Sequence, residues 1–148
     1  MEHWWNWLPL VANFATAIGV CVALFQQVRA KKHSIVQFED SLTREYRSII
    51  GRLPIGMLLG EDVPAAAVDE YLRTFYLYFD LTNEQIFLRR RERVSEATWR
   101  RWQQGIRAMM ELPAFAKAWR EIGMRAASRF QDVRRLEETE FDSDPLTW

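Results

Sequence analysis

The chain has few of the residues on which catalytic and metal sites depend. Its 148 residues include one cysteine, Cys21, and two histidines, His3 and His33. A lone cysteine excludes a disulfide framework and a thiol-rich metal site. Because neither histidine lies beyond position 33, the rest of the chain cannot form a histidine metal cage or a Ser-His pair. Phosphate-binding glycine loops are also missing. We therefore predict a protein that is not an enzyme and holds no metal or cofactor.

Positive charge is absent from the beginning of the chain. No lysine or arginine precedes Arg29, although basic and acidic residues balance at 20 each over the whole sequence. This segment contains an uncharged run, LPLVANFATAIGVCVALF, over residues 8–25. Its flanks carry Trp4, Trp5 and Trp7 on one side and Arg29, Lys31 and Lys32 on the other. A bilayer core requires roughly 20 apolar residues, and tryptophans and basic residues are typical of its interfaces. We predict a transmembrane helix over residues 8–27, with the lipid bilayer as its partner.

The basic flank also predicts the orientation of this helix. Lysine and arginine favour the cytoplasmic side, so residues 1–7 are expected outside and the remainder in the cytoplasm, as in a single-pass protein of the bacterial inner membrane. A cleaved signal peptide would require positive charge before the apolar run and a cleavage site after it, and neither is present. The rival interpretation is a buried helix of a soluble protein, because the run is short and contains Asn13 and Thr16.

Small residues recur within the predicted membrane helix. Ala15, Gly19 and Ala23 are spaced four apart and therefore share one helix face. Such a face allows two membrane helices to approach closely, which predicts a homo-oligomer. The alternative is that small residues are simply frequent in membrane helices.

Beyond the membrane helix, residues 28–136 read as an all-α cytoplasmic bundle of about four helices. Apolar residues from Ile35 to Leu53 recur at spacings of three and four, so the membrane helix can continue as a stalk to Leu53, although a bend near residues 32–34 fits equally well. A second helix starts at Pro64, and its heptad-like seam makes it the expected centre of the core. Ser95 is the expected N-cap of a third helix, and Pro113 opens a fourth.

The last residues of the chain differ from the helices before them. Residues 137–148 contain five acidic residues and no basic one, and they show no hydrophobic period. We predict a flexible acidic tail.

Three stretches resemble a group of bacterial proteins that join one N-terminal membrane helix to a small cytoplasmic helical domain. They are FEDSLTREYRSIIGRLPIGMLLGE (38–61), FYLYFDLTNEQIFLRRRERVSEATWRRWQQGI (75–106) and LPAFAKAWREI (112–122). The resemblance implies the same fold and anchoring. It implies no activity, because none is known for the group.

One polar constellation lies on the expected central helix. Asp80 and Glu84 share a helix face with Asn83 beside them, and like charges at this spacing repel unless a cation lies opposite. A hard-cation site, and with it a metal-dependent enzyme, is one interpretation. The favoured one is a polar network to Arg100 or Arg107 that fixes two helices together.

The most specific signal is a cluster of arginines without lysine: Arg89, Arg90, Arg91, Arg93, Arg100, Arg101 and Arg107. The guanidinium group binds phosphate or carboxylate through two parallel hydrogen bonds. The favoured interpretation is a solvated face paired with the chain's own carboxylates, including those of the tail. The second is an anion-binding surface for lipid phosphates or a protein. The third is a nucleotide or nucleic-acid site with Trp99 or Trp102 stacking on a base.

These observations favour binding over catalysis. We predict a membrane-anchored helical protein that senses or tethers an unknown protein or anionic ligand. A membrane effector that responds to a phosphate ligand or nucleotide, as in stress or anti-phage defence, is the alternative. Nucleic acid is not favoured as a partner, because the spacing of Trp99, Trp102 and Ile106 is that of a helix face in a core.

Overall fold

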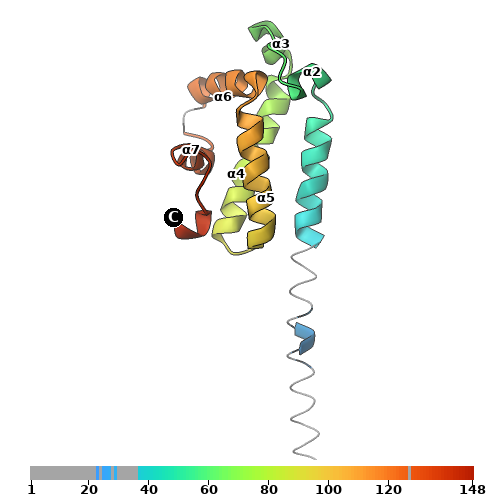
Figure 1. Cartoon of the computed structure of the whole chain (residues 1–148), viewed down its shortest axis with the longest axis vertical. Helices are drawn as coiled ribbons and strands as arrows, with labels where there is room; N and C mark the ends of the chain where they lie inside the picture. The colour runs from blue at the N-terminus through green and yellow to red at the C-terminus, as the bar shows by residue number, and fades with distance from the viewer. Residues whose placement is uncertain (1–22, 24, 28, 30–36, 127) are drawn as a thin grey trace, which may run out of the picture. The chain divides into compact units, whose positions relative to one another are not determined.

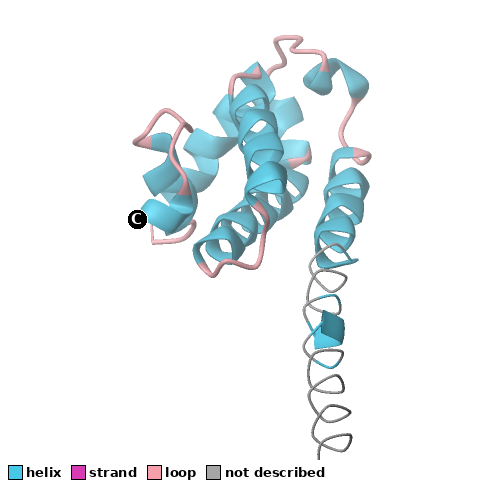
Figure 2. Ribbon diagram, turned by 60° about the horizontal axis from the view of Figure 1, so that its bottom comes forward, coloured by secondary structure: helices cyan, strands magenta, loops and turns pink. Residues whose placement is uncertain are grey.

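A computed structural model describes residues 23, 25–27, 29, 37–126 and 128–148. The chain divides into two compact units, Met1–Gln37 and Phe38–Trp148. Every regular element among the described residues is a helix, with no strand in these ranges, which confirms the predicted all-α class (Figures 1 and 2). The second unit begins later than the predicted boundary at residue 28 and extends to the last residue.

Most of the predicted membrane helix lies outside the described residues. Residues 23 and 25–27 are described, and they are helical and exposed. Within the described ranges, no helix has the length and the apolar character that crossing a bilayer requires. Of the predicted association residues only Ala23 is described, and Ala15 and Gly19 are not. The predicted continuity of the helix across residues 30–36 also falls outside the described part.

Residues 38–50 form the first helix of the second unit, called helix 38–50 below. The sequence predicts this helix as far as Leu53, but the structure ends it earlier. The amide of Gly51 donates to the carbonyl oxygen of Arg47 (2.9 Å), and the next two amides bond only three residues back. Pro54 disfavours helical backbone at the residue before it, so the helix closes in a turn.

A carboxylate ties helix 38–50 to α5 (Glu96–Met110). Glu39 accepts hydrogen bonds from the Ser95 amide (2.8 Å) and from the Thr98 hydroxyl (2.7 Å). Ser95 is the N-cap of α5, as predicted, and its hydroxyl accepts from the Thr98 amide (3.2 Å). The Glu39 carboxylate therefore lies at the positive end of the α5 dipole. In both views helix 38–50 runs beside α5 (Figures 1 and 2).

Two short helices, α2 (Ile55–Leu58) and α3 (Ala65–Glu70), lead into the long helix α4 (Leu72–Arg90). Pro64 directly precedes α3, in agreement with the predicted start. The predicted second helix is, however, broken at Tyr71, whose backbone lies at φ −102° and ψ 12°. Neither glycine nor proline occurs at this point, so nothing in the local sequence explains the break.

The predicted fourth helix is divided into α6 (Pro113–Arg125) and α7 (Gln131–Glu137). Pro113 occupies the first turn of α6, as predicted. Before α7, Phe130 has left-handed backbone angles, φ 57° and ψ 40°, which an aromatic residue rarely adopts. Its ring is buried against Tyr76, with 5.1 Å between ring centroids. Burial of such a ring stabilises by about 2 kcal/mol, which is enough to offset backbone strain of similar size.

The structure of the acidic tail, residues 137–148, differs from the flexible segment that the sequence predicts. The tail ends in a short 3₁₀ helix, η2 (Pro145–Thr147), and Pro145 is buried. Asp144 forms an ion pair with Arg89 of α4, and Trp148 packs against the core. Net charge and missing periodicity did not reveal these contacts, because each depends on a single side chain and a distant partner.

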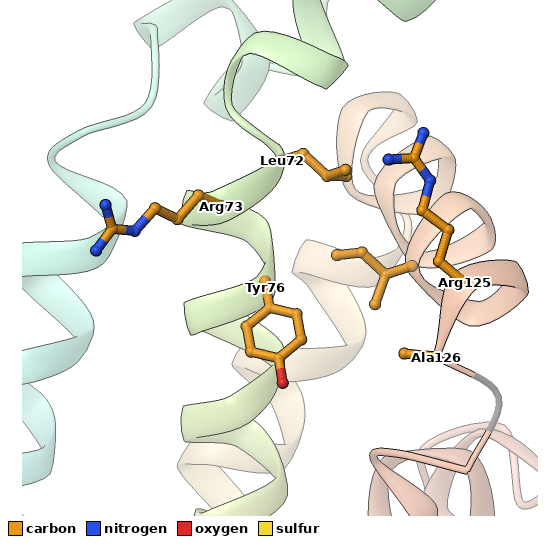
Figure 3. Close-up of a pocket in the computed structure, with 6 residues that line it drawn as sticks. Leu72, Arg73, Tyr76, Arg125 and Ala126 are labelled. Atoms are coloured by element: carbon orange, nitrogen blue, oxygen red, sulfur yellow. The ribbon is translucent and has the colours of Figure 1, made fainter.

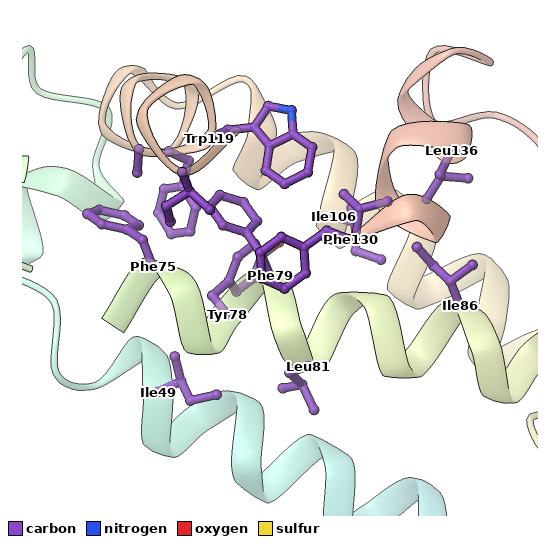
Figure 4. Packing of buried hydrophobic residues seen from close by; sticks show 14 of the residues in the cluster. Ile49, Phe75, Tyr78, Phe79, Leu81, Ile86, Ile106, Trp119, Phe130 and Leu136 are labelled. Carbon is purple, nitrogen blue, oxygen red and sulfur yellow. The ribbon is translucent and has the colours of Figure 1, made fainter. Parts of the chain in front are cut away.

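The core of the second unit is built around α4, as predicted, with α3, α6, α7 and η2 packed against it. Aromatic rings fill its centre. Phe75 lies edge-to-face on Phe115, with 5.0 Å between centroids, and Phe79 lies 4.8 Å from Trp119. Figure 4 shows Phe75, Phe79 and Trp119 between α4 and α6, while Ile49 faces α4 from helix 38–50. Such aromatic contacts add roughly 0.5–1.5 kcal/mol each to the hydrophobic term.

Candidate functional site

The predicted arginine cluster does not form one surface, because Arg89 is buried and hydrogen-bonded within the chain. Only 6% of this residue is exposed. Its guanidinium donates twice to the Asp144 carboxylate, from Nε (2.9 Å) and from Nη2 (2.6 Å), and Nη1 donates to the Val94 carbonyl oxygen (2.9 Å). These bonds hold the pKa of Asp144 below its usual value. Arg89 therefore holds the tail against α4.

Three further arginines are paired with carboxylates of the chain itself: Arg90 with Asp132 (2.7 Å), Arg100 with Glu96, and Arg107 with Glu111 (3.6 Å). The two pairs on α5 are exposed on both sides. Exposed ion pairs contribute roughly 0–1 kcal/mol, so these pairs stabilise the fold little. For these arginines the geometry matches the interpretation in which the chain's own carboxylates are the partners.

The remaining arginines of the cluster pair with no carboxylate among the described residues. The guanidinium of Arg91 lies over the ring of Phe87, 5.3 Å from its centroid. Arg93 is exposed in the turn before α5. Arg101 is exposed on α5 and lines a groove. The cluster is thus divided between structural pairs and a few free guanidinium groups.

The predicted polar network on α4 is not formed. Asp80 and Glu84 are exposed and hydrogen-bond to none of the described residues, including Arg100 and Arg107. Asn83 instead accepts a hydrogen bond from the backbone amide of Asp132 (3.2 Å), at the first turn of α7. In the described ranges, no three acidic, histidine or cysteine side chains come close enough to hold a metal ion together.

A groove of about 290 Å³ lies between helix 38–50, α4 and α5. We call it the Tyr78 groove, and it is lined by Thr43, Tyr46, Arg47, Tyr78, Gln85, Arg101, Trp102, Gly105 and Ile106. Its lining comes from three segments that are far apart in the sequence. Ligand pockets usually measure about 300–1,000 Å³, so the Tyr78 groove is suited to a small molecule.

Two buried polar groups line the floor of the Tyr78 groove. Tyr78 is 2% exposed, and its hydroxyl has no hydrogen-bond partner among the described residues. Burial raises the pKa of this phenol far above its usual value and Tyr46 adds to the effect, which outweighs the opposing influence of the Thr82 side chain, so the hydroxyl stays protonated. Gln85 is 5% exposed, and its amide bonds to no described residue. An unsatisfied buried hydroxyl costs about 1–3 kcal/mol, which a ligand that bonded to Tyr78 would recover.

Charge and aromatic surface lie around these polar groups. Arg47 and Arg101 are both exposed, and neither pairs with a carboxylate in the part of the chain that the structure describes. Tyr46 and Trp102 are partly buried and contribute aromatic walls. The Tyr78 groove therefore combines an unneutralised positive rim with apolar rings and hydrogen-bonding groups on its floor.

The structure separates the two tryptophans that the sequence names as stacking candidates. Trp99 is 1% exposed, so its ring is part of the core and cannot stack on a ligand. Its indole nitrogen has no partner among the described residues. Trp102, one turn further along α5, lines the Tyr78 groove. Only Trp102 is placed to contact a ligand.

Sequence reasoning missed most of this site. Arg47, Tyr46 and Gln85 lie on helix faces that the hydrophobic pattern assigns to packing or to solvent. One signal was present in the sequence, since Gly105 interrupts the pattern of a helix that otherwise has good helix formers. A methyl group added at Gly105 would meet no atom within 4 Å, so the space beside its backbone is open.

A second pocket of about 280 Å³ lies between α4 and α6 and is a weaker candidate. It is lined by Leu72, Arg73, Tyr76, Ile122, Arg125 and Ala126. Figure 3 shows the guanidinium groups of Arg73 and Arg125 pointing away from each other. Arg125 is already paired with Glu121 (2.5 Å). This pocket offers mainly apolar contact and no convergent charge.

Comparison of the chain with protein-family models, with curated proteins and with solved structures finds no match. Its function therefore has to be inferred from the geometry of its own residues.

Proposed function

We propose that this chain is a membrane-anchored helical sensor that binds a small ligand in the Tyr78 groove. One observation carries the proposal: Tyr78 lines this groove, and its buried hydroxyl forms no hydrogen bond to the described residues. Natural proteins rarely leave buried polar groups without a partner, and exceptions are frequent at functional sites. A ligand that bonds to this hydroxyl would gain affinity from it.

The sequence supports an anchor in the bacterial inner membrane. Residues 8–25 are uncharged, tryptophans precede them, and Arg29, Lys31 and Lys32 follow. This pattern places the N-terminus outside and the Tyr78 groove in the cytoplasm. The resemblance to bacterial proteins with one membrane helix and a cytoplasmic helical domain supports the same arrangement.

The position of the groove in the chain supports sensing. Helix 38–50 supplies Thr43, Tyr46 and Arg47 to the lining, and it is the first helix after the predicted membrane segment. A ligand that contacts this helix changes the balance of its packing against α4 and α5. Through the anchor, and through self-association at Ala15, Gly19 and Ala23, such a change can alter how neighbouring copies assemble.

A metal-dependent enzyme based on Asp80 and Glu84 is a weaker proposal. It requires both carboxylates to converge with arginines or with further ligands, whereas the two side chains are exposed on α4 and lack such partners among the described residues. If Asp80→Ala and Glu84→Ala abolish a cellular activity without changing stability, the enzyme proposal gains and the binding proposal fails.

The binding proposal is tested by closing the groove. The full chain in detergent micelles is screened by thermal shift against a panel of small metabolites, beside Gly105→Leu as the blocked variant. Gly105→Ala is the matched control, since it removes the glycine without filling the groove. We expect compounds that raise the Tm of the wild type and of Gly105→Ala but not of Gly105→Leu. The proposal is overturned if every stabilising compound acts equally on all three proteins.

The orientation is tested separately. A reporter fused after Trp148 that is active only in the cytoplasm should be active, and activity of an exported-only reporter at the same position would overturn the proposed topology. Labelling of a cysteine introduced at Glu2 by an impermeant reagent should succeed on intact cells.

A further inference from the structure

We infer that the ligand of the Tyr78 groove is a nucleoside monophosphate: its phosphate binds Arg47 and Arg101, and its base lies against Tyr46 and Trp102. This inference rests on the proposed function, because it names the ligand of the same groove. It differs from the predicted arginine site, since of that cluster only Arg101 takes part.

The charge of the rim favours a phosphate over a carboxylate. Arg47 and Arg101 lie on different helices but line the same groove, and neither is neutralised by a described carboxylate. Five other arginines of this unit are paired with carboxylates of the chain: Arg89, Arg90, Arg100, Arg107 and Arg125. A phosphate monoester carries a charge of about −1.5 to −2 at neutral pH, which matches two guanidinium groups better than a single carboxylate does.

The walls favour a planar ring. Tyr46 and Trp102 belong to different helices, line the same groove and are partly buried, so each keeps part of its ring accessible. Aromatic side chains bind bases by stacking, which contributes about 1–3 kcal/mol per base. An aliphatic phosphate, such as a sugar phosphate, would leave these rings without a matching surface.

The floor favours a ring with hydrogen-bonding edges. The Gln85 amide offers a donor and an acceptor side by side, the pair that recognises an adenine edge in other contexts. The Tyr78 hydroxyl adds a further donor. A base can bond to the Gln85 amide, whereas a purely hydrocarbon ring would bury this amide without a partner.

The size of the groove limits the ligand. At about 290 Å³ it lies just below the usual range of about 300–1,000 Å³ for ligand pockets, which favours a mononucleotide over a dinucleotide. Gly105 contributes no side chain at this point, and the space beside its backbone is open.

The experiment is isothermal titration of the full chain in nanodiscs of zwitterionic lipid. The probes are AMP, GMP, CMP and UMP, compared with adenosine, ribose 5-phosphate and inorganic phosphate. We expect at least one monophosphate to bind about tenfold more tightly than its nucleoside and about fivefold or more tightly than either phosphate without a base, because a charged hydrogen bond contributes about 1.5–3 kcal/mol and a stacked base about 1–3 kcal/mol.

Variants assign each part of the ligand to its residues. Arg101→Gln should weaken monophosphate binding about tenfold while leaving nucleoside binding unchanged. Tyr78→Phe should weaken monophosphate and nucleoside alike, by about threefold to tenfold. Gly105→Leu should abolish both. Arg93→Gln is the matched control, since Arg93 is also exposed and free of a described carboxylate but lies outside the groove.

The outcomes separate this inference from the proposed function. Equal affinity for monophosphates, ribose 5-phosphate and inorganic phosphate overturns the base contact, and an equal loss in Arg93→Gln and Arg101→Gln overturns the phosphate contact. If no monophosphate binds while other compounds stabilise the protein in a Gly105→Leu-sensitive manner, the nucleotide inference fails and the sensor proposal stands. If no compound distinguishes wild type from Gly105→Leu, both fail.

Discussion

Arg89 and Tyr78 lie on the same helix, about three turns apart, and both are buried. Their polar groups differ in whether the chain supplies hydrogen-bond partners for them. Arg89 has three hydrogen bonds to partners that the chain supplies, two of them to Asp144. The Tyr78 hydroxyl has none among the described residues. The indole nitrogen of Trp99 also lacks a described partner, but Trp99 does not line the Tyr78 groove, whereas Tyr78 does, so the Tyr78 hydroxyl marks the place where something else is expected to bind.

The largest loss of stability is expected when Arg89, the satisfied member of this pair, is substituted. Arg89→Ala leaves the Asp144 carboxylate without its bidentate partner and opens space at the end of α4. We expect a loss of roughly 3 kcal/mol in the free energy of unfolding, measured by urea denaturation of the full chain in micelles. Arg93→Ala, an exposed arginine in the next turn, should change stability by less than about 0.5 kcal/mol. Equal effects of the two substitutions would contradict the structural role of Arg89.

The Glu39 carboxylate is a second polar group that is satisfied within the chain, and it ties helix 38–50 to α5. Glu39→Ala removes the acceptor for the Ser95 amide and the Thr98 hydroxyl and should cost about 2 kcal/mol. Hydrogen exchange should rise first in helix 38–50, because this helix loses its tie to α5. Glu45→Ala on the exposed face of the same helix is the control. Uniform exchange across the unit would show that Glu39 is not a local tie.

Removal of the unsatisfied Tyr78 hydroxyl should not lower the free energy of unfolding, in contrast to the two substitutions above. Tyr78→Phe removes a buried hydroxyl without changing the ring, so the free protein should keep its stability or gain about 1 kcal/mol. Most buried tyrosines lose stability on the same change, because their hydroxyl bonds are lost. A loss of more than about 1 kcal/mol in thermal or urea unfolding would mean that the hydroxyl has a protein partner and that the groove is not open to a ligand.

The smallest expected effect is on acid stability. Hydrogen bonds from Arg89 lower the pKa of Asp144 in the folded protein below its ordinary value of 3.8. The unfolded chain therefore takes up this proton first, so the stabilisation is complete above pH ~4 and is lost as the pH falls through the lower folded value. Asp144→Asn should flatten the pH dependence of stability in that range. Asp62→Asn, at an exposed pair with Lys117, should flatten it less.

Helix starts could be predicted because their causes are local. Ser95 caps α5, Pro113 opens α6 and Pro64 precedes α3, each through residues within one turn. The helix breaks at Tyr71 and Phe130 could not be predicted in this way. Phe130 adopts left-handed backbone angles because its ring is buried against distant residues. The ordered tail depends likewise on contacts with distant residues, among them the pairing of Arg89 with Asp144 across 55 residues.

The candidate site was harder to predict than the fold. Arginines near one another in the sequence drew attention to Arg89–Arg107, yet Arg89 is structural and only Arg101 reaches the Tyr78 groove. The second guanidinium group of the groove belongs to Arg47 on helix 38–50. Sequence spacing does not reveal that Arg47 and Arg101 line the same groove. Gly105 was the one local indication, because a glycine in the interior of a helix lowers helix stability and therefore indicates a packing or functional role.

The most direct test of the central claim is nuclear magnetic resonance of the full chain labelled with ¹⁵N-glycine. The chain has six glycines, so the spectrum is simple, and Gly105 lies in the Tyr78 groove whereas Gly123 lies on α6. On titration with AMP or another compound that raises the Tm, we expect the Gly105 amide to shift in proportion to saturation while Gly123 stays in place. Saturable binding that leaves Gly105 unchanged would contradict a ligand site in the Tyr78 groove.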